Sequence, residues 1–197
     1  MVSGSAADPP RCAWAVAADG RPVELMTAYH DDEWGQVQRD DRRLFEKLCL
    51  EAFQSGLSWL TILRKRESFQ RAFAGFEPAR VARFDDADRA RLMADSSIVR
   101  NRAKIDAVIW NAGRFDELVA REGPFAEWID RTIPVRGPLP PDATMADLPA
   151  ETAESASLAR ALRDRGFRFV GPTTAYAFMQ ATGIVDDHLP GCFRYRG

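Results

Sequence analysis

Asp186-Asp187-His188-Leu189-Pro190-Gly191-Cys192 is the stretch that decides how the two ends of this chain are arranged. It contains one of the two histidines and one of the three cysteines of the sequence; the other histidine is His30, and Cys12 precedes it. Two thiols and two imidazoles are the usual ligands of a tetrahedral Zn²⁺ ion. The spacing from His188 to Cys192 suits two ligands on one tight turn, which Gly191 allows to close.

We therefore predict one structural zinc ion per chain, bound by residues from both ends of the sequence: Cys12, His30, His188 and Cys192. Such a site would fasten the N-terminal segment to the C-terminal segment, and a closed shell of four protein ligands leaves no position for a substrate. Two alternatives stay open at this point. The four could be ordinary residues, or Cys12 and Cys192 could form a disulfide.

The composition limits the class of protein. The chain has 197 residues, 46% hydrophobic and 28% charged, which indicates one globular domain or two small lobes that share a core. It has no run of about 18 apolar residues, and residues 1–10 lack the basic region and apolar core of a secretory signal. An odd number of cysteines favours a reducing compartment, so we expect a cytoplasmic protein. The formal net charge is −2, so binding to nucleic acid would need a local basic patch.

Apolar residues recur at helical spacing through most of the chain, and no strand pattern of useful length is present, so the predicted fold class is all-α. We predict a disordered lead over residues 1–11 and a single all-α domain over residues 12–197. The first helix is expected after Asp40-Asp41 and the second after Ser58. Later helices are expected at 85–94, around 105–119, 125–129, 155–165 and 172–183, with an extended connector at 134–149.

Three cations stand at the predicted start of the long helix: Arg100, Arg102 and Lys104. Cations are unfavourable there because the helix macrodipole is positive at its N-terminus. We interpret them as a site for an anion, with phosphate the natural candidate. The alternative is a run of solvated charges.

A second group of residues is aromatic and comprises Trp14, Tyr29, Trp34 and Trp59. Trp14 and Tyr29 each lie within two residues of a proposed metal ligand, so the metal would bring them against the helices. Glu51 lies seven residues after Leu44 and therefore projects within about 20° of it, at the margin of a buried face. Aromatic faces and one carboxylate make a receptor for a flat, positively charged ring. The alternative is that the tryptophans are simply large core residues.

Other chemistries find little support in the sequence. It has no G-x-G-x-x-G or Walker-type loop, so we expect no nucleotide cofactor. With both histidines assigned to the metal, none remains to activate a serine or cysteine nucleophile. Cys49 lies on an apolar helix face and is interpreted as an unreactive core thiol.

Several segments together resemble the type I 3-methyladenine DNA glycosylases. They run in order along almost the whole chain: Cys12-x-Trp14, Tyr29-His-Asp-Asp-Glu-Trp-Gly35, Leu50-Glu51, Gln54-x-Gly56-Leu-Ser-Trp59, Ile98-Val-Arg-x-Arg-x-Lys-Ile105, Gly166-Phe-x-Phe-Val-Gly171 and His188-x3-Cys192. The resemblance implies an all-α fold of the helix-hairpin-helix glycosylase type, with two small lobes around a base-binding cleft. It also implies a structural zinc that joins the two ends through the same four ligands.

The resemblance also assigns roles to single residues. Glu51 corresponds to the residue that reads the polar edge of the excised base and is the main catalytic candidate. Tyr29 and Trp59 correspond to pocket aromatics, and Trp14 is expected to line the same pocket. Two segments correspond to DNA contacts: Gly56-Leu57, which approaches the gap left by the flipped nucleotide, and the stretch Arg100, Arg102, Lys104, which matches part of the hairpin on the DNA backbone.

Family members often carry a tyrosine three residues before Tyr29, where this chain has Met26. Methionine can pack against a base but cannot donate a hydroxyl hydrogen bond, so the selectivity of the pocket could differ. Asp186 is a second catalytic candidate, because an aspartate near this place assists catalysis in the broader superfamily, although the type I enzymes work without it.

The function implied is that of a DNA repair enzyme, an N-glycosylase that flips out and hydrolytically excises 3-methyladenine, leaving an abasic site. Its partner would be double-stranded DNA that contains alkylated bases, and we expect a monomer that does not bind a membrane. Two alternatives remain, a glycosylase of broader range that includes 3-methylguanine and a non-catalytic, zinc-stabilised protein that binds damaged DNA. Excision of 3-methyladenine from alkylated DNA separates the last of these from the enzymes.

Overall fold

The computed structural model describes residues 8–134, 136–137 and 139–196, so most of the predicted lead (residues 1–11) lies outside the described residues. Over the described residues the chain is helical, and its one extended pairing is an isolated bridge between Val16 and Pro22. The prediction of an all-α fold is confirmed. The helices are η1 (Ala13–Ala15), α1 (Glu24–Asp32), α2 (Asp41–Gln54), α3 (Trp59–Ala72), η2 (Ala74–Phe76), α4 (Pro78–Val81), α5 (Asp86–Ala94), α6 (Arg102–Glu122), α7 (Phe125–Thr132), η3 (Met145–Asp147), α8 (Ala153–Asp164) and α9 (Pro172–Ala181).

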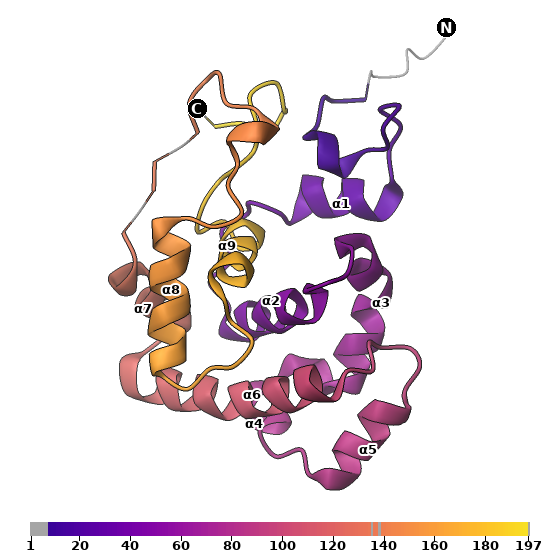
Figure 1. Cartoon of the computed structure of the whole chain (residues 1–197), viewed down its shortest axis with the longest axis vertical. Helices are drawn as coiled ribbons and strands as arrows, with labels where there is room; N and C mark the ends of the chain where they lie inside the picture. The colour runs from indigo at the N-terminus through magenta and orange to yellow at the C-terminus, as the bar shows by residue number, and fades with distance from the viewer. Residues whose placement is uncertain (1–7, 135, 138, 197) are drawn as a thin grey trace, which may run out of the picture.

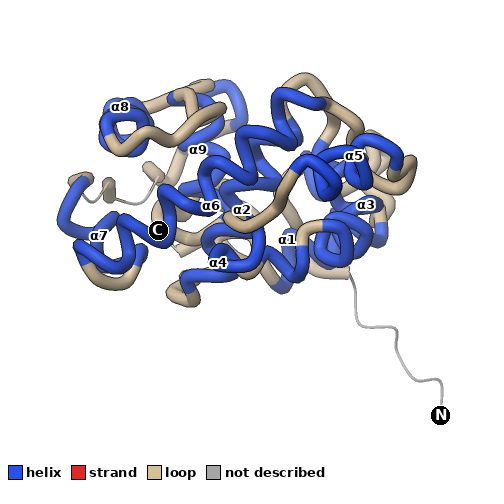
Figure 2. The backbone as a smooth tube through the Cα atoms, turned by 90° about the horizontal axis from the view of Figure 1, so that it is seen from below, coloured by secondary structure: helices blue, strands red, loops and turns tan. Residues whose placement is uncertain are grey.

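Helix α2 forms the centre of the molecule, and α3, α6, α7 and α9 pack around it (Figures 1 and 2). It begins where Asp40 caps it by accepting a hydrogen bond from the backbone N–H of Arg43. Its apolar face joins a core rich in phenylalanine, which includes Phe45, Phe53, Phe69, Phe73, Phe115 and Phe125. Burying each such side chain contributes about 1.5 to 3 kcal/mol. Among the described residues, none of the helices combines the length and apolar character that a membrane span requires.

Helices α8 and α9 pack side by side and are joined by a short loop at residues 165–171 (Figure 1). Two ties hold this loop to α6. The side chain of Asn111 pairs with both backbone groups of Arg168, at 2.8 and 2.9 Å, and the indole N–H of Trp110 donates to the carbonyl of Gly166 at 2.8 Å. Phe169 in the loop is exposed and has a positive φ of 56°. The loop is therefore hydrogen-bonded to α6 and leaves one phenylalanine side chain exposed.

The N-terminal segment and the segment after α9 lie together at one end of the molecule (Figure 1). The backbone N–H of Phe193 donates to the carbonyl of Pro10 at 2.9 Å, and the N–H of Gly35 donates to Gln180 O at 3.0 Å. Gly183 has a φ of 68°, and a Cβ there would lie 2.6 Å from the backbone of Gln36. The close approach of the two segments therefore depends on glycine.

Several helical segments differ from the prediction: the short helices η1, η2 and α4 were not expected, and two further differences have a clear cause. Helix α1 was not expected, because its N-terminus has no side-chain cap and its buried residues, Tyr29 and His30, are not aliphatic. The connector at 134–149 was expected to be extended throughout, yet Met145–Asp147 forms a 3₁₀-helix closed by a capping box between Thr144 and Asp147.

Candidate functional site

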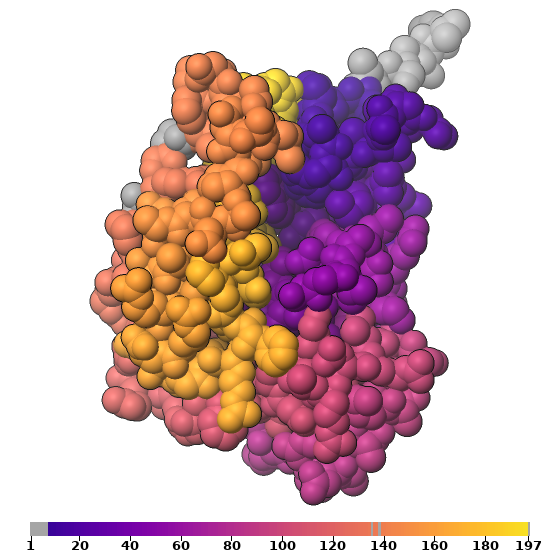
Figure 3. Space-filling model, in the orientation of Figure 1, coloured from indigo at the N-terminus to yellow at the C-terminus, as the bar shows by residue number. Residues whose placement is uncertain are grey.

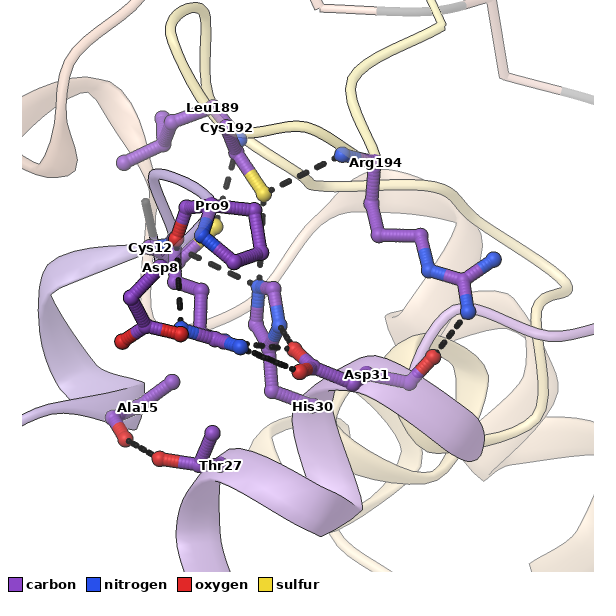
Figure 4. Close-up of polar contacts among 11 residues, drawn as sticks. Asp8, Pro9, Cys12, Ala15, Thr27, His30, Asp31, Leu189, Cys192 and Arg194 are labelled. Carbon is purple, nitrogen blue, oxygen red and sulfur yellow. Dashed lines mark hydrogen bonds and ion pairs between the residues drawn. The ribbon is translucent and has the colours of Figure 1, made fainter. Parts of the chain in front are cut away.

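Three of the four predicted metal ligands form a compact cluster between the two ends of the chain. The ligand atoms of Cys12, His30 and Cys192 all lie within 4.8 Å of one another, and all three residues are buried. Nε2 of His30 lies 3.4 Å from Sγ of Cys192 (Figure 4). About this separation is expected between two ligands of one tetrahedral zinc, whose bonds are about 2.0 to 2.3 Å long. The cysteines are free thiols, so the disulfide between Cys12 and Cys192 is not formed.

The fourth predicted ligand, His188, lies beside this cluster but outside the group of three. Its ring meets the ring of His30 edge to face, with 5.0 Å between the centroids. Its Nε2 is buried and has no hydrogen-bond partner among the described residues. A buried nitrogen without a partner is costly, and a metal ion would satisfy it.

Each histidine is oriented by a carboxylate. Nδ1 of His30 lies 2.8 Å from Asp31, and Nδ1 of His188 lies 2.7 Å from Asp186. Such bonds hold the rings so that both Nε2 atoms can bind a metal, which is the usual arrangement around zinc-binding histidines. The side chain of Asp186, predicted as a second catalytic candidate, is thus engaged with His188, and it is absent from the residues that line the pocket described below.

The electrostatics of the cluster suit a metal. Burial raises the pKa of Cys12 to about 12, so the thiol keeps its proton unless a cation replaces it. Burial lowers the pKa of His30, which leaves the neutral imidazole that a metal requires. Backbone N–H groups of Leu189 and Arg194 donate to the two sulfur atoms at 3.5 and 3.4 Å. The donor set, two thiols and buried imidazole, fits Zn²⁺.

A pocket of about 440 Å³ opens beside this cluster, on the face shown in Figure 3, where the surface is hollowed between the indigo and purple residues and the orange and yellow ones. All five residues predicted to bind the substrate line it: Trp14, Met26, Tyr29, Glu51 and Trp59. The other lining residues are Trp34, Gln54, Met145, Leu148, Pro149, Ala150, Thr173, Tyr176, Ala177 and Gln180. Chain segments from both halves of the sequence therefore form one pocket.

The aromatic walls connect the pocket to the metal cluster. The Trp14 ring lies 5.3 Å from the His30 ring and 6.3 Å from the Tyr29 ring, between centroids. Tyr29 in turn lies 5.2 Å from Trp59, and Trp34 lies 5.0 Å from Trp14. Because Trp14 and Tyr29 lie close to ligands in both sequence and space, a metal at the cluster would set the position of these walls.

Glu51 is the acidic residue of the pocket lining and is 5% exposed. Burial raises its pKa from the ordinary value of 4.5 to about 8, while the nearby ammonium of Lys47 acts in the opposite direction. A carboxylate in such surroundings gains much from a positively charged ligand, since the surrounding aromatic rings screen it little.

The wall formed by α9 was missed by sequence reasoning. Tyr176 and Gln180 are one helical turn apart and line the pocket together. Both donate to the buried carboxylate of Asp187, at 2.5 and 2.9 Å, and Arg136 forms an ion pair with the same carboxylate. Their spacing at i and i+4 places both side chains on one helix face, but the sequence alone does not bring Asp187 and Arg136 to them.

The loop between α2 and α3 lies at the pocket edge and contains Gly56 and Leu57. Gly56 has a φ of 83°, and Leu57 is 39% exposed although it is apolar. Lys104 from α6 donates to the carbonyls of Phe53 and Ser55 at 2.9 and 2.6 Å. Leu57 is therefore exposed on a turn whose preceding carbonyl groups are hydrogen-bonded to Lys104.

The three predicted phosphate ligands do not share one environment. Arg100 and Arg102 are exposed, with Arg100 just before the Asn101 cap of α6. Lys104 is 8% exposed and donates two hydrogen bonds to the carbonyls at the end of α2. Its buried position corrects the prediction for this residue: Lys104 supports the Gly56-Leu57 turn and is not an exposed contact for phosphate.

Residues 19–195 match a family model described as methyladenine glycosylase. The chain is 41% identical over 187 residues to DNA-3-methyladenine glycosylase 1 of Escherichia coli (strain K12), with 95% of this chain and 97% of that protein covered.

Solved structures of similar proteins have the same fold. The crystal structure of a 3-methyladenine DNA glycosylase I superposes with a TM-score of 0.86 at 41% identity and covers 94% of this chain and 100% of that one. A structure described as the basis of 3-methyladenine recognition by the Staphylococcus aureus enzyme gives a TM-score of 0.82 at 32% identity, covering 94% and 98% of the two chains.

Proposed function

The chain belongs to the methyladenine glycosylase family, and we propose that it is a DNA N-glycosylase that excises 3-methyladenine from alkylated DNA. The observation that carries the proposal is the buried carboxylate of Glu51 in a pocket walled by Tyr29 and Trp59. Alkylation at N3 makes the adenine ring cationic, so the aromatic faces and the carboxylate suit the damaged base better than the neutral one. Recognition of charge, together with shape, gives the selectivity.

The reaction needs little acid–base help. The damaged nucleotide leaves the base stack and enters the pocket, where the base lies against Trp59 and Tyr29 and presents its polar edge to Glu51. The bond between the base nitrogen and the anomeric carbon breaks, and its electron pair neutralises the departing base. The oxygen of water bonds to the anomeric carbon and loses a proton to solvent, which leaves an abasic site.

Zinc would serve a structural purpose here. Cys12, His30 and Cys192 would bind it, with His188 as the fourth ligand, and bound zinc would supply a fixed tetrahedral joint between the two ends of the chain. The unpartnered Nε2 of His188 and the two free thiols support this assignment. We expect a monomeric protein with one such ion, in the reducing cytoplasm where thiols persist.

Two surface loops with an exposed apolar residue, Leu57 and Phe169, are candidates for contacts with a duplex. Leu57 is exposed at the turn after α2, in position to fill the gap that a flipped nucleotide leaves. The loop at 165–171 between α8 and α9 is the better candidate for the hairpin of a helix-hairpin-helix element than the stretch around Arg100. Arg100 and Arg102 would contact phosphate beside them. In this arrangement residues 12–197 form one domain with two lobes around the pocket.

The deciding experiment measures base release from methylated DNA over a panel of alkylated bases. Release of 3-methyladenine with an abasic product supports the enzyme, and tight binding without release would leave the damage-binding alternative. Met26 at the pocket wall makes 3-methylguanine the second base to test, because its side chain cannot donate a hydrogen bond. Release of 3-methylguanine at a comparable rate would support the broader range.

A further inference from the structure

A buried ammonium group stands directly behind the pocket. Lys47 is on α2 and 4% exposed, and it is not among the residues that line the cavity. It forms an ion pair with Glu33, which follows α1. Burying a lysine is costly, so a position of this kind calls for a physical reason.

Three walls of the pocket lie around this one ammonium. Its Nζ is 4.5 Å from the centroid of the Tyr29 ring and 6.0 Å from that of Trp59. Glu51 is four residues after Lys47 on the same helix, so the two side chains share a face. Within the part of the chain that the structure describes, Lys47 is thus a cation in reach of both principal rings and of the pocket carboxylate.

The other charges nearby have partners besides Lys47. Arg66 on α3 binds Glu33 at 2.5 Å and Glu46 at 2.8 Å, and Glu46 also accepts from Gln70. Loss of Lys47 would therefore leave Glu33 paired with Arg66. Glu51 has no hydrogen bond or ion pair with the described residues, and Lys47 is the charged group that favours its ionised form.

We propose that Lys47 is a positioning residue of the excision reaction: its ammonium favours the ionised form of Glu51, which binds a cationic base, and it packs behind the rings of Tyr29 and Trp59. This inference rests on the proposed glycosylase function. Lys47 acts through Glu51 and does not touch the substrate. In this arrangement the Glu51 side chain lies between the ammonium of Lys47 on one side and the damaged base on the other.

The pKa directions agree with this arrangement. Burial is the main cause that raises the pKa of Glu51 to about 8, and Lys47 is the one opposing cause. Burial lowers the pKa of Lys47, while Glu33 and Glu51 act to raise it and Arg66 to lower it. Each member of the Lys47–Glu51 pair therefore favours the charged form of the other.

The test replaces Lys47 with methionine, which is similar in length and has no charge. Single-turnover release of 3-methyladenine from methylated DNA is measured between pH 6 and pH 9 for the wild type and Lys47→Met. Because the carboxylate is the active form, release rises with pH through the titration of Glu51. We expect the midpoint of Lys47→Met to move up by about one pH unit, with release about 10-fold slower at pH 7 and recovering towards pH 9.

Two further variants control for structure. Arg66→Met removes another cation of the same cluster, and we expect a lower Tm with an unchanged pH midpoint, because Arg66 does not act on Glu51. Lys47→Arg keeps the charge, and we expect the wild-type midpoint. If Lys47→Met does not fold, Lys47→Gln takes its place with the same expected shift.

The contradicting outcomes are distinct. An unchanged midpoint in Lys47→Met, or a loss of release that is equal at every pH, would overturn the role of Lys47. A wild-type protein that releases no base would instead defeat the proposed function. In that case the carboxyl titration of Glu51, followed by NMR in the free protein, still decides whether Lys47→Met raises its midpoint.

Discussion

Ionised Glu51 favours binding of a cationic base but lowers the stability of the free folded protein. It is a carboxylate on the buried face of a core helix, without a hydrogen bond from the described residues. A cationic base would supply the missing partner, so the folded protein carries an unfavourable group that becomes favourable on binding. The cost of burying this charge in the free protein is thus offset when the cationic base binds.

Replacing Glu51 with glutamine should remove most of the excision activity, by about 100-fold or more, because the neutral amide gives the cationic base no counter-charge. Binding to undamaged duplex should stay within about twofold, since Glu51 lies inside the pocket. Base release and gel-shift affinity measure the two effects. Turnover close to the wild type would contradict the role assigned to this carboxylate.

The same variant should be more stable than the wild type at neutral and alkaline pH. The pKa of Glu51 is about 8 in the folded protein, above the ordinary 4.5, so the folded state binds the proton more tightly than the unfolded state. Stability therefore falls as pH rises from about 4.5 to about 8 and is constant above that, as far as this group is concerned. The Tm difference between Glu51→Gln and wild type should widen over that window. A constant difference from pH 5 to pH 8 would contradict it.

At the scale of elements, sequence pattern predicts the helices that bury aliphatic and phenylalanine side chains. Helix α2 and helix α6 follow that rule and have clear caps at Asp40 and Asn101. Helix α1 does not follow it, because its buried side chains are Tyr29 and His30 and it packs against η1 and α3. Periodicity detects contact with an aliphatic core, whereas the buried side chains of α1 contact the rings of Trp14 and Trp59.

The residues of the candidate site likewise fall into those that the sequence predicts and those that it does not. Ligands and pocket aromatics could be predicted because their chemistry is visible in the residue type. Lys104 could not, since a lysine that caps a neighbouring helix looks the same in sequence as one that binds phosphate. The α9 wall, with Tyr176 and Gln180, depends on Asp187 and Arg136, whose meeting requires the fold.

The salt dependence of DNA affinity distinguishes basic residues that would contact phosphate, Arg100 and Arg102, from Lys104, which supports the Gly56-Leu57 turn. Replacing Arg100 and Arg102 with alanine should weaken binding to any duplex and lower the slope of log affinity against log salt by about 1 for each phosphate that is no longer neutralised. Lys104→Met should leave that slope unchanged and slow excision, because the Gly56-Leu57 turn loses its support. Equal salt slopes for all three proteins would show that the exposed arginines do not bind phosphate.

Over the whole molecule, the two ends meet at the cluster of Cys12, His30 and Cys192 and pack closely around it. A Cβ on Gly35 would lie 2.6 Å from the His188 ring, and the φ of Gly35 is 71°. Gly35→Ala should therefore displace His188, lower the bound zinc per chain and reduce the Tm by several degrees. Gly20→Ala is the matched control, since it has a similar φ of 82° but nothing within 4 Å. Equal zinc content in both variants, measured by atomic absorption, would argue against His188 as a ligand.

The long separation between the ligands has a consequence for how the protein is made. Cys192 is 162 residues after His30, and its thiol lies 3.4 Å from that imidazole. Helices α2 to α9 are therefore synthesised before a metal at this cluster could fix the positions of Trp14 and Tyr29. A polypeptide that ends before Cys192 lacks this connection even when its helices are complete, so truncated translation products should be unable to excise bases from DNA.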